Sequence, residues 1–160
     1  MNVTVATLQA FADAWNSHDV ESLMSFLTDD CVFEASPGPE VWGTSYVGRE
    51  AVQAGFSDAW KTFSDARWLY PQHFVCGDRG VSEWTFTGTR TDGSRVEVNG
   101  CDVFTFREGK IAVKNSYRKN RPPLPARLRS PSTGAIAKCG RMRVRELGSW
   151  RRSAVGRKQR

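Results

Sequence analysis

The stretch that decides the fold is RVEVNGCDVFTFREGKIAVKNSYRK, residues 95–119. Two runs rich in β-branched and aromatic residues are joined by a tight turn at 108–109, a pattern that predicts an antiparallel hairpin. Asp102 shares its parity with Phe104 and Phe106, and strand side chains alternate between the two faces. A carboxylate on an apolar face is costly unless it is paired, hydrogen-bonded or protonated. Asp102 is therefore the leading candidate for a functional residue.

The β pattern begins well before this hairpin. Residues 67–76 and 81–90 have the composition of strands, and we expect Pro71 to interrupt the first because proline cannot donate to a strand ladder. The Asp-Gly pair at 92–93 is a strong hairpin signal. Four consecutive strands in a meander are therefore predicted for the second half of the domain.

The first half of the chain reads as helical. Apolar residues spaced by three and four predict helices over 4–16 and 49–63, and Asp19 can cap a short helix between them. Residues 31–35 read as a short strand and 36–48 as a loop rich in Pro and Gly. This order predicts an α+β domain in which helices cover a curved antiparallel sheet.

Charge divides the chain into two parts. The net charge of +6 combines −5 for residues 1–119, with 11 Lys/Arg against 16 Asp/Glu, and +11 for residues 120–160. We therefore predict a folded domain over 1–120 and a basic, disordered tail over 121–160. The tail has no nucleic-acid motif, so no specific nucleic-acid partner is expected.

Composition also limits the chemistry. The four cysteines show no C-x-x-C spacing and are expected to be reduced, while His18 and His73 are not placed to complete a zinc site. There is no Gly-rich phosphate loop and no nucleophile elbow. We predict no metal and no cofactor. An apolar run of signal-peptide or membrane-spanning type is also missing, so a cytoplasmic protein without a membrane span is expected.

Three local strings carry a resemblance to a known family. They are AWNSHD at 14–19, DDCVFE at 29–34, and GCDVFTF at 100–106 followed by GKI at 109–111. Over about residues 4–119 the chain resembles the nuclear transport factor 2-like superfamily, in particular its SnoaL-like and ketosteroid-isomerase-like branch.

The resemblance implies a cystatin-like cone: about three N-terminal helices packed on a curved, mostly antiparallel sheet around a hydrophobic pocket. It also implies a homodimer packed sheet to sheet. Asp102 would lie inside the pocket as a general acid/base or, if protonated, as an oxyanion donor. The positions that match the isomerase's oxyanion tyrosine and general base are Phe11 and Ala35. Steroid isomerase activity is therefore not expected.

Partners for Asp102 depend on strand register. Apolar parity turns Glu83 outward, whereas counting back from the 92–93 turn along the family pattern turns it inward as a second catalytic carboxylate. In the last strand, apolar parity turns Asn115 inward, whereas the family pattern turns Lys114 inward, where it would contact Asp102 or a substrate carboxylate. A bulge decides between these alternatives, and we keep Glu83, Lys114 and Asn115 as candidates.

Aromatic residues are numerous enough to line a pocket for a flat or cyclic apolar ligand. The candidate wall residues are Trp15, Tyr46, Trp60 and Trp84. Two functions follow. One is a cofactor-independent isomerase, cyclase or lyase that acts on an apolar, carbonyl-bearing molecule through Asp102. The other is a non-catalytic ligand-binding or accessory subunit of a larger enzyme.

Overall fold

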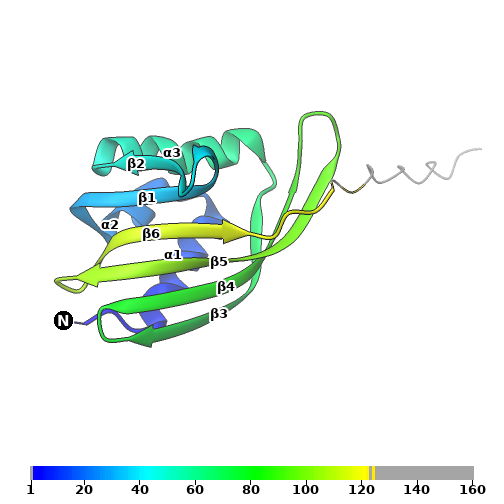
Figure 1. The fold of residues 1–160 in the computed structure, drawn as a ribbon. Coiled ribbons are helices and arrows are strands. Elements are labelled where there is room, and N and C mark those ends of the chain that lie inside the picture. The colour runs from blue at the N-terminus through cyan, green and yellow to red at the C-terminus, as the bar shows by residue number, and fades with distance from the viewer. Residues whose placement is uncertain (1, 123, 125–160) are drawn as a thin grey trace, which may run out of the picture. The chain divides into compact units, whose positions relative to one another are not determined.

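A computed structural model describes residues 2–122 and Leu124, in which three helices lie against one face of a six-stranded sheet (Figure 1). The predicted α+β class with a mostly antiparallel sheet is confirmed. Of the tail predicted over 121–160, residues 123 and 125–160 lie outside the described residues. The elements are α1 (Val5–Ser17), α2 (Val20–Ser25), β1 (Leu27–Glu40), β2 (Gly43–Val47), α3 (Arg49–Thr62), β3 (Arg67–Cys76), β4 (Arg79–Thr89), β5 (Arg95–Arg107) and β6 (Lys110–Arg118).

The strand order in the sheet is β2-β1-β6-β5-β4-β3. Strands β3 to β6 form the predicted antiparallel meander, and β1 pairs in parallel with β6. The interruption expected at Pro71 is present, because the pairing of β3 with β4 shifts between Leu69 and Gln72, and Tyr70 has a left-handed backbone with φ of 55°. Extra residues of this kind bend a strand and change which side chains face the core.

The loop predicted over 36–48 is instead an irregular hairpin. Strand β1 continues to Glu40 and β2 pairs back onto it, with a register shift between Ala35 and Glu40. Gly43 makes the return: its φ is 83°, and a Cβ at this position would lie 1.8 Å from the carbonyl oxygen of Ala35. Pro and Gly here shape an irregular strand pair rather than an open loop.

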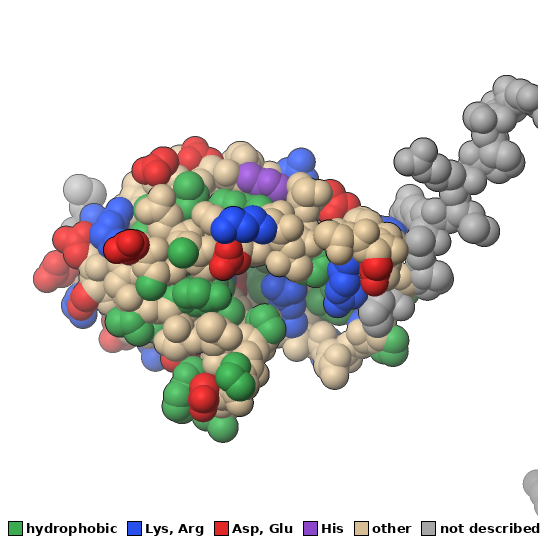
Figure 2. Space-filling model, turned by 90° about the horizontal axis from the view of Figure 1, so that it is seen from above, with side chains coloured by type: hydrophobic (Ala, Val, Ile, Leu, Met, Phe, Trp, Pro, Cys, Tyr) green, Lys and Arg blue, Asp and Glu red, His purple; other side chains and the backbone are tan. Residues whose placement is uncertain are grey.

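Helix α1 is capped at its N-terminus and hydrogen-bonded to the sheet near its C-terminus. Thr4 and Thr7 form a reciprocal capping box at its N-terminus. Near its C-terminus the Asn16 amide donates to the Trp68 carbonyl and its oxygen accepts from the Trp68 N–H, both at 2.9 Å. The buried face of the helix, which includes Leu8, packs onto the sheet. Figure 2, which views the molecule from the side of α3, shows a hollow with Lys or Arg side chains inside it.

Candidate functional site

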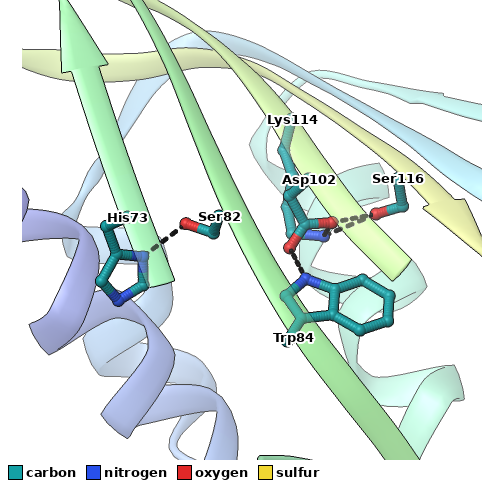
Figure 3. Close-up of polar contacts among 6 residues, drawn as sticks. All are labelled: His73, Ser82, Trp84, Asp102, Lys114 and Ser116. Atoms are coloured by element: carbon teal, nitrogen blue, oxygen red, sulfur yellow. Dashed lines mark hydrogen bonds and ion pairs between the residues drawn. The ribbon is translucent and has the colours of Figure 1, made fainter. Parts of the chain in front are cut away.

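Asp102 lies on the inner face of β5, 5% exposed, and accepts three hydrogen bonds (Figure 3). Lys114 Nζ lies 2.7 Å and Ser116 Oγ 2.6 Å from its Oδ1, while Trp84 Nε1 lies 3.0 Å from its Oδ2. Lys114 also donates to Ser116 at 2.7 Å. All three neighbours can donate to Asp102, an arrangement that suits a carboxylate acting as acceptor. In the alternative of a protonated oxyanion donor, Asp102 would donate its proton instead.

One extra residue in β6 brings Lys114 to Asp102. Thr105 pairs with Val113 but Phe106 pairs with Ile111, so Ala112 is a bulge that reverses the parity of the strand. The family-pattern alternative for Lys114 is therefore the one the structure has. The prediction that Asn115 faces inward is wrong.

Asn115 instead lies on the outer face of the sheet, half-buried. Its amide donates to the hydroxyl of Tyr117, which shares that face and is 54% exposed. Both residues follow the bulge by an odd number of positions. The same reversal that turned Lys114 inward turned them outward.

Trp84 reaches Asp102 because Gly100 leaves space for its ring. Gly100 is the cross-strand partner of Trp84, and a Cβ on Gly100 would lie 2.4 Å from the Trp84 ring and 2.4 Å from the carbonyl oxygen of Tyr117. Without that Cβ the indole lies flat on the sheet. The N–H then points along β5 to the Asp102 carboxylate.

Lys114 is a buried cation, 4% exposed, with both polar and aromatic neighbours. Its ammonium lies 4.8 Å from the centroid of Phe33 and 5.3 Å from that of Trp15, within cation–π range. Burial lowers the pKa of Lys114 below its ordinary value, and the attraction of Asp102 offsets this in part. The result is an ammonium that releases its proton more readily than an exposed lysine.

A small cavity adjoins this ion pair at Asp102. Its volume is about 20 Å³, room for about one water molecule. The aromatic part of its wall is Phe11, Trp15, Trp68, Trp84 and Phe104, and the polar part is His73, Ser82 and Asp102.

His73 and Ser82 form a second polar pair on this wall. Neither is among the site residues predicted from the sequence. His73 Nδ1 lies 2.7 Å from Ser82 Oγ, and its Nε2 is buried without a partner among the described residues. Burial lowers the pKa of His73 below 6.5. Trp68 and His73 have opposite parity, so only the bulge before Gln72 brings both inward. Pro71 was the signal that could have pointed to it.

Glu83 lies on the opposite face of the sheet from Asp102. It is exposed, and its cross-strand partner is Cys101, whereas the partner of Asp102 is Ser82. With Tyr70 it borders a shallow outer depression. The inward alternative for Glu83 is wrong, because β4 runs without a bulge opposite β5 and apolar parity holds. The structure therefore does not bring two carboxylates together.

The predicted aromatic wall is only partly present. Trp15 and Trp84 line the cavity. Trp60 lies one layer behind, 5.2 Å from Trp15 between ring centroids, and Tyr46 stacks on Phe33 at 5.6 Å. Neither Trp60 nor Tyr46 belongs to the cavity lining. At the two positions where the isomerase pattern has polar groups, Phe11 belongs to the apolar wall and Ala35 packs on the core.

Among residues 2–122 and 124, no three His, Cys, Asp or Glu side chains come together as a metal site. No helix in the same range is both long and apolar enough to cross a membrane. Cys31, Cys76 and Cys101 carry free thiols.

A curved sheet backed by three helices, with a charged pair sealed in an aromatic interior, defines the class of small α+β pocket folds. The family model for the SnoaL-like domain matches residues 8–114, and the chain belongs to this family. No protein of curated function matches the sequence.

Solved structures agree on the fold. A cystatin-like protein of unknown function from Xanthomonas campestris is 18% identical, with a TM-score of 0.65 over 75% of this chain and 92% of its own. A protein from Xanthomonas campestris pv. campestris, provisionally described as a polyketide cyclase, is 20% identical, with a TM-score of 0.61 over 69% and 85%. A ketosteroid isomerase-like protein from Catenulispora acidiphila, solved with trimethylamine, is 16% identical, with a TM-score of 0.62 over 72% and 86%. At these identities the similarity shows the fold alone.

Proposed function

We propose that this SnoaL-like protein acts without a cofactor on a small, apolar, carbonyl-bearing molecule, as an isomerase, cyclase or lyase, with Asp102 as the general base and acid. One observation carries the proposal. An aspartate carboxylate, 5% exposed, forms part of the wall of a small aromatic cavity and is held there by three donors. Buried, oriented carboxylates are typical of proton-transfer sites.

In the proposed step Asp102 removes a proton from the carbon next to the substrate carbonyl. The C–H bond breaks, an O–H bond forms on Asp102, and the electron pair moves to the carbonyl oxygen as an enolate. Lys114, 2.7 Å from Asp102, is the nearest cation to stabilise that charge. Asp102 then returns the proton to another atom of the substrate. The similarity to a protein provisionally described as a polyketide cyclase makes ring closure one of the reactions to test.

A second candidate is a ligand-binding or accessory subunit without catalysis. The size of the cavity favours it, because about 20 Å³ admits no ring system until aromatic side chains move. The apolar residues Phe11 and Ala35, where isomerases carry polar groups, also favour it. The two candidates differ in one respect: only the enzyme needs the carboxylate of Asp102 for turnover.

Hydrogen–deuterium exchange separates the two candidates. The full-length protein is incubated in D₂O with a panel of cyclic ketones, and loss of the α-proton signal is followed by NMR. If Asp102 is the base, Asp102→Asn slows exchange by about 10²–10⁴-fold, whereas Glu83→Gln on the opposite face leaves it unchanged. Exchange at the wild-type rate in a folded Asp102→Asn protein would exclude catalysis through Asp102. Ligand-dependent fluorescence changes without any exchange would favour the binding subunit.

We also propose a homodimer that packs sheet to sheet. The outer face of the sheet carries no helix, and Phe74 and Tyr117 are 57% and 54% exposed on it. Apolar groups gathered on an uncovered face are typical of interaction surfaces. Light scattering should give twice the chain mass, and a Phe74→Glu/Tyr117→Glu protein should be a monomer. A wild-type monomer at micromolar concentration contradicts the dimer.

Two further proposals concern the chain's limits and location. We propose that residues 1–120 fold as one domain without the basic segment, so that a chain ending after Pro123 keeps its fold and its ligand. Loss of either would contradict this.

We place the protein in the cytoplasm, in agreement with the free thiols of Cys31, Cys76 and Cys101.

A further inference from the structure

Arg118 is a second cation that faces inward; it is half-buried and forms no ion pair among the described residues. It follows the Ala112 bulge with the same parity as Lys114 and therefore faces inward. Its guanidinium carbon lies 4.3 Å from the centroid of Phe86, and its Nε is buried without a hydrogen-bond partner among the described residues. The ion pairs within that part of the chain do not include it.

The interior charges do not balance. Asp102 is paired with Lys114, so Arg118 is in excess by one positive charge. Arg118 pairs across the strands with Gly100, two positions from the Ser116–Asp102 pair, which is about 7 Å along the strand. Burial lowers the pKa of Arg118 and Asp102 raises it, so the carboxylate acts on both cations. A buried charge without a partner destabilises a fold, and arginine does not escape by losing its proton.

A second arginine, Arg90, is linked to Arg118 by a chain of contacts through two aromatic rings. The Arg90 guanidinium carbon lies 5.8 Å from the centroid of Phe63, and its Nη1 is buried without a described partner. Phe63 in turn packs edge-to-face on Phe86 with centroids 5.2 Å apart. We call Arg90 and Arg118 the arginine pair.

We propose that the arginine pair binds the carboxylate of a small organic acid, with Arg118 as the main donor and the carbon skeleton directed toward Asp102. This rests on the proposed function in one respect, that the interior admits a small molecule. A planar guanidinium held against a ring presents a fixed fork that matches a carboxylate. A carboxylate monoanion would neutralise the charge of Arg118, the main donor.

The test compares matched acids and amides. Cyclohexanecarboxylate and cyclohexanecarboxamide, then benzoate and benzamide, are titrated into the full-length protein and followed by tryptophan fluorescence. Wild type should bind each acid at least about tenfold more tightly than its amide, the effect of one charged hydrogen bond. Arg118→Gln should abolish that preference, Arg118→Lys should keep part of it, and Arg79→Gln, on the exposed start of β4, should keep all of it.

The outcomes separate this inference from the proposed function. Equal affinity for acid and amide in wild type, or a preference that survives Arg118→Gln, overturns the inference. The proposal that the interior admits a small molecule would still stand. Failure of both members of each pair to bind overturns both. Arg118→Met supplies a readout without ligand: removing a half-buried cation that has no ion-pair partner among the described residues should raise the melting temperature, whereas a purely structural Arg118 predicts a lower one.

Discussion

Two acidic residues on neighbouring cross-strand pairs lie in opposite environments, one on the inner face of the sheet and one on the outer face. Ser82 pairs with Asp102 on the inner face, and the next pair, Glu83 with Cys101, lies on the outer face. Asp102 is sealed in with Lys114, whereas Glu83 remains in water beside a shallow depression. The residue type does not decide the environment of an acid in this protein; strand parity does.

Lys114→Met should produce the largest loss of folding stability, because it removes the cation of the buried ion pair on the inner face. The substitution leaves the Asp102 carboxylate buried without its cation, which costs about 3–5 kcal/mol. Urea unfolding of Lys114→Met and of the matched Lys110→Met, an exposed residue at the start of β6, measures the difference. The double variant Asp102→Asn/Lys114→Met should recover part of the loss. Equal stability of the two lysine variants would contradict a buried ion pair.

Gly100→Ala should cause the next largest loss of folding stability. The added Cβ meets the Trp84 ring and a backbone carbonyl at 2.4 Å, and overpacking of this kind costs about 1–3 kcal/mol. Because the ring must lift, the hydrogen bond from Trp84 to Asp102 should be lost and tryptophan fluorescence should change. Asn99→Ala, the adjacent position on the outer face, is the control. Comparable stability losses in the two variants would mean that Gly100 does not position the indole.

His73 predicts a smaller, pH-dependent effect on the inner face. Its pKa is lowered by burial, so between the folded value and 6.5 the unfolded chain binds more protons than the folded one. Folding stability should therefore fall as the pH decreases below 6.5 and be unaffected by this group well above it. Melting temperatures of wild type and His73→Gln between pH 7.5 and 5 measure this contribution. A wild-type decline no steeper than that of His73→Gln would contradict it.

Glu83→Gln should change least. An exposed carboxylate without an ion pair among the described residues contributes within about 0.5 kcal/mol of stability. Urea unfolding at neutral pH should superimpose on that of wild type. A larger loss would show that the outer face is more constrained than its exposure indicates, as it would be at a dimer interface.

Much of the fold was predictable because periodicity is a property of unbroken elements. Residues 67–76 and 95–107 were predicted as strands with the bounds that the structure has. Asp102 was found by parity, since no bulge lies between it and Phe104. Parity does not decide which face of the sheet Lys114 occupies, and it does not identify His73 as a site residue. The reason is the same for both. Each follows a bulge, and the sequence does not say where an extra residue is accommodated.

The register at Ala112 also affects the order in which the chain assembles. Asp102 and Lys114 are 12 residues apart within one hairpin, so they meet after closing a short loop, a fast event with a small entropic cost. By contrast β1 must find β6 across about 80 residues of chain, a slower and costlier closure. On loop-closure grounds alone, we expect the ion pair to form before β1 closes the sheet. During synthesis this interior is completed only when the last strand of the sheet has left the ribosome.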